Sequence, residues 1–225
     1  MKSVRYLYLV IVYGMMVGVW AGIAFVFIFP QIIVFTRVIP SSAIPLIFFR
    51  NSFAVTLISL GGVANCLVEV RIWRNKKLSR RLNRSVDPLY FLIKRFSNTY
   101  EKLGRFYRSL HLGLFAFPVL SIFVIIFIAS FYFTIFILKL GVDGFFIVVK
   151  SIPYALLEIS VYFYGAYLAL EIANNLDPYV KEKNLKLFVR ESKKSIKDKR
   201  VWKILLVLYL LLFISAVLEQ FFTSL

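Results

Sequence analysis

Cysteine and histidine are almost absent from this chain of 225 residues, which has only Cys66 and His111. A single cysteine excludes a disulfide within the chain, and a single histidine removes most zinc sites and most Ser-His-Asp arrangements. The His-Glu-x-x-His helix, the Gly-x-Ser-x-Gly elbow and the paired aspartates of an aspartyl site are also absent. We therefore expect no enzymatic activity, no catalytic residue, no metal and no cofactor.

Acidic residues are also few, with 11 Asp and Glu against 28 Lys and Arg and a net charge of +17. The chain is instead rich in apolar residues: 60% are hydrophobic, 18% are aromatic, and the mean hydropathy is +0.81. In soluble domains only about half of the residues are apolar. The composition therefore predicts a polytopic membrane protein whose basic segments contact anionic lipid headgroups or acidic protein surfaces rather than nucleic acid.

Apolar runs of about 20 residues or more are long enough to cross the roughly 30 Å hydrocarbon layer. They predict an all-α bundle of about five transmembrane helices within one membrane domain that covers residues 1–225. The expected spans cover residues 6–29, 45–70, 111–138, 152–173 and 204–222. We expect Gln31–Ile39 to lie in the membrane interface, and Lys139–Lys150 to form a loop.

Two basic segments, residues 71–108 and 174–203, lie between these spans. The first mixes basic and aromatic residues at helical spacing, which is typical of an amphipathic helix on a membrane surface. Asp177-Pro178 is a helix start signal in the second segment. Together with the N-terminus these segments hold 24 of the 28 basic residues. The positive-inside rule then predicts a plasma membrane protein with a cytoplasmic N-terminus and an extracytoplasmic C-terminus.

Glu158 lies inside the fourth apolar span and Glu219 inside the fifth. An ionised carboxylate in hydrocarbon costs at least a few kcal/mol, so it normally has a partner. Arg50 and Asn51 at the start of the second span are candidates, with Arg37 as a second cation. We expect Arg50, Asn51, Glu158 and Glu219 to form a polar cluster in the outer half of the bilayer. The alternatives are that Glu158 is protonated or bonded only for packing, and that Asn51 is a helix cap.

Small residues mark two helix-packing faces. Gly14, Gly18 and Gly22 recur at four-residue spacing in the first span, and Gly165 begins a similar face in the fourth. Pro153 is expected to open the fourth span, which would place Glu158 about 9 Å along it. His111 is expected at the interface, at the start of the third span.

Three segments resemble the stage II sporulation protein M family. Phe49–Leu57 is similar to that family's asparagine-containing second helix. Ile152–Glu158, followed by Gly165-Ala166, is similar to its Pro-His-Gly-x-x-Glu signature. Leu212–Thr223 is similar to the C-terminal segment of the family. Tyr154 and Ala155 replace the His-Gly of the signature, so no imidazole role carries over. The resemblance implies an integral inner-membrane protein. The family's namesake is the membrane partner of cell-wall hydrolases during engulfment in spore formers, and other members accompany a chaperone-like ATPase.

Two functions from different classes fit these observations. The first is a non-enzymatic scaffold that recruits a protein partner, or a second copy of the chain, to a membrane or envelope complex. The alternative is a small proton- or cation-linked transporter or channel that uses Glu158 and Glu219. An intramembrane hydrolase is the least favoured reading, because two glutamates without a histidine are its only candidate groups.

Overall fold

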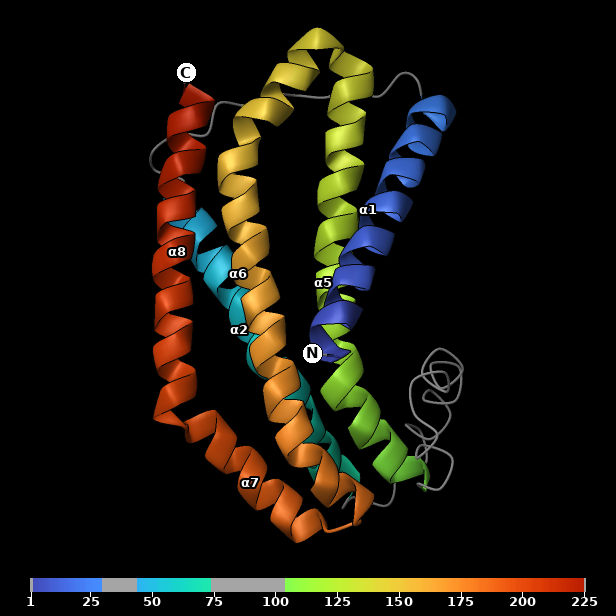
Figure 1. Cartoon of the computed structure of the whole chain (residues 1–225), viewed down its shortest axis with the longest axis vertical. Coiled ribbons are helices and arrows are strands. Elements are labelled where there is room, and N and C mark those ends of the chain that lie inside the picture. The colour runs from blue at the N-terminus through green and yellow to red at the C-terminus, as the bar shows by residue number, and fades with distance from the viewer. Residues whose placement is uncertain (1, 30–43, 74–103, 225) are drawn as a thin grey trace. The chain divides into compact units, whose positions relative to one another are not determined.

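The computed structural model describes residues 2–29, 44–73 and 104–224, and almost all of these residues lie in helices (Figure 1). Within these ranges there is no strand, so the all-α prediction is confirmed. The helices in chain order are α1 (Lys2–Ile28), α2 (Ile44–Trp73), α5 (Arg105–Leu140), α6 (Val142–Lys181), α7 (Leu185–Lys197) and α8 (Lys199–Ser224). The segments 31–39 and 74–103, for which the sequence predicts interfacial and amphipathic structure, lie outside the described residues.

Five of these helices, α1, α2, α5, α6 and α8, are long and apolar enough to cross a membrane. Many of their large apolar side chains point outward, among them Trp20, Phe49 and Leu156. In water such a surface would be costly, whereas lipid chains cover it at no cost. The prediction of a polytopic helical membrane protein is therefore confirmed.

The turn between α5 and α6 is much shorter than the expected loop at Lys139–Lys150. Only Gly141 separates the two helices, and its φ of +58° is a left-handed conformation that glycine adopts without strain. Asp143 lies in the first turn of α6, where a negative charge is favourable beside the helix N-terminus. The apolar run Phe145–Val149 continues the helix, because it can face lipid.

Two prolines that the sequence marks as helix starts, Pro153 and Pro178, both lie inside α6. A proline removes one backbone hydrogen bond, but membrane helices tolerate this when nearby groups satisfy the freed backbone. As a result α6 has 40 residues, and Glu158 lies about 24 Å from its start instead of 9 Å.

The helices divide into two compact units. Unit 1 comprises Met1–Thr56, Val119–Gly165 and Ile204–Leu225, and unit 2 comprises Leu57–Pro118 and Ala166–Lys203. The chain passes between the units within α2, α5, α6 and α8, whereas α1 belongs to unit 1 and α7 to unit 2.

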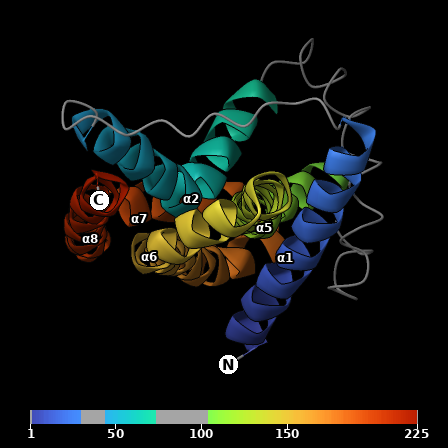
Figure 2. The same cartoon turned by 90° about the horizontal axis from the view of Figure 1, so that it is seen from above.

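In unit 1, α1 packs along α5 through its glycine face (Figures 1 and 2). A Cβ on Gly14 would approach Ile126 and the Phe123 carbonyl, and one on Gly18 would lie 2.6 Å from the Phe127 carbonyl oxygen. Gly22 faces Thr134 in the same way. The three glycines thus allow the α5 backbone to come close to α1. The fourth glycine expected to pack, Gly165, is buried within α6.

Candidate functional site: a polar link in unit 1

Asn51 occupies the second turn of α2 and is 3% exposed. Its amide nitrogen Nδ2 donates a hydrogen bond to Glu158 Oε1 on α6. Its amide oxygen Oδ1 accepts a hydrogen bond of 3.2 Å from Arg50 Nε. Both ends of the buried amide are therefore satisfied, one by a carboxylate and the other by a guanidinium.

Glu158 is half-buried on α6, Glu219 is half-buried on α8, and Arg50 is exposed on α2. Arg50 and Glu219 both lie within electrostatic range of the Glu158 carboxylate, and Arg50 lies within range of Glu219. The structure thus brings three of the expected residues together through direct hydrogen bonds and places the fourth, Glu219, nearby. The arrangement holds two carboxylates against one guanidinium.

Hydroxyl contacts add further links between the same three helices, and sequence reasoning missed them. The Ser215 hydroxyl of α8 donates to the Tyr154 carbonyl of α6 over 3.1 Å. Thr56 Oγ1 on α2 lies 2.7 Å from Tyr209 OH on α8. Because the Thr56 hydroxyl proton is directed at the Ser52 carbonyl, Tyr209 is the donor in that pair. Serine, threonine and tyrosine are common in membrane helices, so no pattern in the sequence singled these residues out.

These contacts bring α2, α6 and α8 together in unit 1, as the two views of the chain also show (Figures 1 and 2). Interhelical hydrogen bonds of this kind contribute about 0.6 kcal/mol each on average and up to about 1.7 kcal/mol. Within the described ranges, no group of three or more His, Cys, Asp or Glu side chains could hold a metal ion. The groups of the link supply hydrogen bonds and charge pairing.

His111 lies in a separate buried group in unit 2. It is a buried residue of α5, and its Nε2 is 3.4 Å from Asp177 Oδ1 on α6. Asp177 also forms an ion pair with Lys181, one helical turn further along α6. The expectation that His111 lies at the membrane interface stays a prediction; its contact with Asp177, 66 positions away in the sequence, had no local signal. The contact ties the start of α5 to the end of α6.

Long apolar helices with outward-facing apolar side chains, joined by a buried polar link, define a multi-pass α-helical membrane protein. The family described as Stage II sporulation protein M matches residues 96–224, which is more than half of the chain. The chain therefore belongs to that family. No curated protein and no solved structure matches the chain.

The matched region contains two of the three segments that carry the sequence resemblance. Ile152–Glu158 and Leu212–Thr223 lie inside it, and so do Glu158 and Glu219. Phe49–Leu57 precedes it, so the likeness of the segment around Asn51 stays a prediction. The family match therefore covers Glu158 and Glu219 but not Arg50 and Asn51.

Proposed function

We propose that this chain is a non-enzymatic membrane scaffold whose α2, α6 and α8 helices are held together by the Arg50–Asn51–Glu158 link, with Glu219 beside it. The proposal rests on one observation: the nitrogen and the oxygen of the Asn51 side-chain amide both form hydrogen bonds, with Glu158 and Arg50. The polar groups of the link bind one another, as expected of a structural contact that fixes helix positions. Such a link keeps α2, α6 and α8 in a fixed register within unit 1, as a scaffold requires.

The proposed location is the inner membrane, with the N-terminus in the cytoplasm and the C-terminus outside. The distribution of basic residues supports this orientation, because 24 of the 28 lie at the N-terminus and in residues 71–108 and 174–203. Cysteine accessibility tests it directly in a Cys66→Ser background. A cysteine placed after Phe222 should react with an impermeant reagent in intact cells, and one at Lys193 should not.

Affinity purification from the native membrane tests the scaffold role. The expected result is a partner, or a second copy of the chain, at fixed stoichiometry with the wild-type protein. Glu158→Ala should reduce that assembly, whereas Glu158→Gln should retain it because its side-chain carbonyl still accepts from Asn51. Absence of any partner, together with solute flux through the purified protein in liposomes, would contradict the proposal.

A proton- or cation-linked transporter is the second candidate. It is favoured by one observation, the presence of two half-buried carboxylates within electrostatic range of a single exposed arginine. Such a pair can exchange a proton or hold a cation along a pathway. Proton and cation flux into liposomes that hold the wild type or Glu158→Gln tests this role. Equal permeability in the two samples would remove it.

A further inference from the structure

The exposed surface of α6 changes character towards its C-terminus. As far as Tyr167 it is mostly apolar or aromatic, and its last exposed aromatic side chains are Tyr164 and Tyr167, 61% and 42% exposed. From Leu168 to Lys181, where every residue is described, no large apolar side chain is exposed. The outward residues there are Asn174, Asn175, Pro178 and Lys181. Tyrosine is enriched at the headgroup level, so α6 leaves the hydrocarbon near Tyr164 and Tyr167.

The start of α8 marks the same boundary. Lys199, Arg200 and Lys203 surround Trp202, which is 45% exposed, and apolar side chains face outward from Leu206 onward. A tryptophan among basic residues is typical of a helix end at the headgroup level. Arg200 Nη2 lies 3.4 Å from Glu171 Oε1 of α6. The two helices therefore cross the membrane boundary at one level, between Tyr167 and Glu171 on α6.

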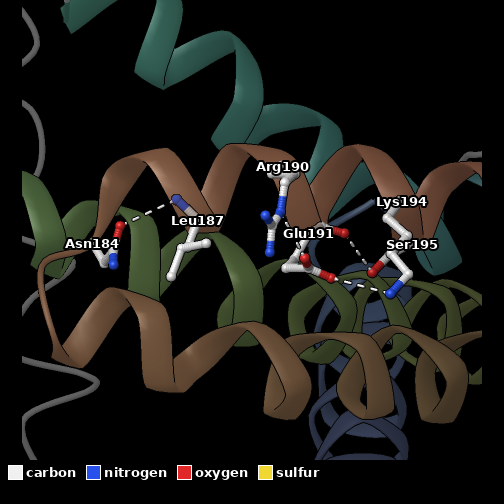
Figure 3. Close-up of polar contacts among 6 residues, drawn as sticks. All are labelled: Asn184, Leu187, Arg190, Glu191, Lys194 and Ser195. Atoms are coloured by element: carbon white, nitrogen blue, oxygen red, sulfur yellow. Dashed lines mark hydrogen bonds and ion pairs between the residues drawn. The ribbon is translucent and has the colours of Figure 1, made fainter.

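The apolar face of α7, the helix between them, is already covered by protein. Asn184 caps α7 by accepting a hydrogen bond of 3.2 Å from the Leu187 amide (Figure 3). Phe188 and Ser192, one turn apart on one face, are 1% and 0% exposed. A helix that binds a membrane surface inserts its apolar face among the lipids. That face of α7 is not available for insertion.

The outward face of α7 is basic, with five basic residues against one acidic residue. Glu191 is the acidic residue, and it pairs with Arg190 at 3.0 Å and Lys194 at 3.6 Å (Figure 3). Among the described residues, Lys186, Lys193 and Lys197 form no ion pair, and all three are exposed. Glu182 and Asp198 are the exposed acidic residues at the two ends. The middle of the face thus carries uncompensated positive charge.

We propose that the outward face of α7 from Lys186 to Lys193, with Arg190 between them, docks an acidic protein surface rather than the lipid headgroups. Lys181 is the last residue of α6 and lies about 21 Å beyond Tyr167 along the helix. Electrostatic attraction to headgroups fades over about 8 Å at physiological salt. The N-terminal half of α7 therefore meets partners from the water, where complementary charge sets partner choice. The inference rests on the proposed scaffold function and names its partner class.

The test uses the full chain in nanodiscs of phosphatidylcholine and two probes, a fluorescent polyglutamate peptide and vesicles that contain phosphatidylglycerol. The double variant Lys186→Glu/Lys193→Glu reverses two unpaired charges on α7. Lys199→Glu/Lys203→Glu is the matched control at the start of α8. Circular dichroism spectra that match the wild type establish that both variants are folded.

At about 0.15 M salt, the α7 variant should bind the peptide about tenfold more weakly than the wild type, a change of about 1.4 kcal/mol. The control should stay within about threefold of the wild type. Vesicle binding should not change in the α7 variant. Unchanged peptide binding by the α7 variant would overturn the proposal. Loss of vesicle binding in the α7 variant would also overturn it, because lipid would then be the partner of this face. Preferential, α7-dependent binding of a single-stranded RNA would overturn it as well.

Co-purification separates this proposal from the scaffold function on which it rests. A native partner that stays bound to the α7 variant as tightly as to the wild type would overturn the docking surface and leave the scaffold intact. Solute flux without any partner would overturn the scaffold itself.

Discussion

The side-chain amide of Asn51 on α2 donates a hydrogen bond to the carboxylate of Glu158 on α6, across 107 positions in the sequence. A buried amide or carboxylate without a partner is costly in an apolar environment. Each of these two residues removes that cost for the other, and Arg50 completes the pairing of the amide oxygen. The contact therefore sets the register of α2 against α6 in unit 1.

Replacing Glu158 should separate the role of its oxygen from the role of its charge. Glu158→Ala leaves the Asn51 amide buried without its acceptor, which typically costs about 1–3 kcal/mol. Glu158→Gln keeps a carbonyl oxygen at the same place and should cost clearly less. Reversible unfolding in bicelles measures both values. Equal losses for the two variants would mean that the contact with Asn51 does not stabilise the fold.

The glycine face of α1 predicts which glycine-to-alanine substitution reduces stability most. A Cβ on Gly18 would lie 2.6 Å from the Phe127 carbonyl oxygen and 2.8 Å from Ser130 Cβ, whereas the closest atoms to one on Gly14 are at 3.2 Å. Because backbone atoms cannot move aside cheaply, Gly18→Ala should destabilise the packing of α1 on α5 by about 1–3 kcal/mol. Gly14→Ala should cost less. The same unfolding assay ranks the two variants, and the reverse order would contradict the packing of α1 described above.

The tight turn between α5 and α6 predicts how strongly alanine substitutions at three glycines reduce stability. Gly144 lies against the Phe136 carbonyl so closely that an added Cβ would displace the backbone, whereas no atom of the described residues lies within 4 Å of a Cβ on Gly104. Gly141 has open space but a φ of +58°. Stability should therefore fall most in Gly144→Ala, by about 1 kcal/mol in Gly141→Ala, and least in Gly104→Ala. A neutral Gly144→Ala variant would show that the two helices do not meet this closely.

Much of the architecture could be predicted because it depends on runs of residues. A stretch of apolar side chains as long as Ile204–Phe222 has few stable alternatives to a membrane helix. The approach of Glu158 to Asn51 could also be anticipated, since few polar groups are available to a carboxylate inside such spans.

Helix ends and single contacts were harder to predict. Pro153 and Pro178 suggest helix starts, yet both continue α6, because a membrane helix can lose a backbone bond and remain packed. The pairs His111–Asp177 and Thr56–Tyr209 depend on three-dimensional register, which no local spacing encodes.

A double-mutant cycle on Asn51 and Glu158 tests the central claim most directly. Unfolding free energies of the wild type, Asn51→Ala, Glu158→Ala and the double variant give the coupling between the two side chains. The polar link predicts a favourable coupling of about 0.6–1.7 kcal/mol, the range of interhelical hydrogen bonds in membranes. Additive losses, with a coupling below about 0.3 kcal/mol, would show that the two side chains do not hold α2 and α6 together.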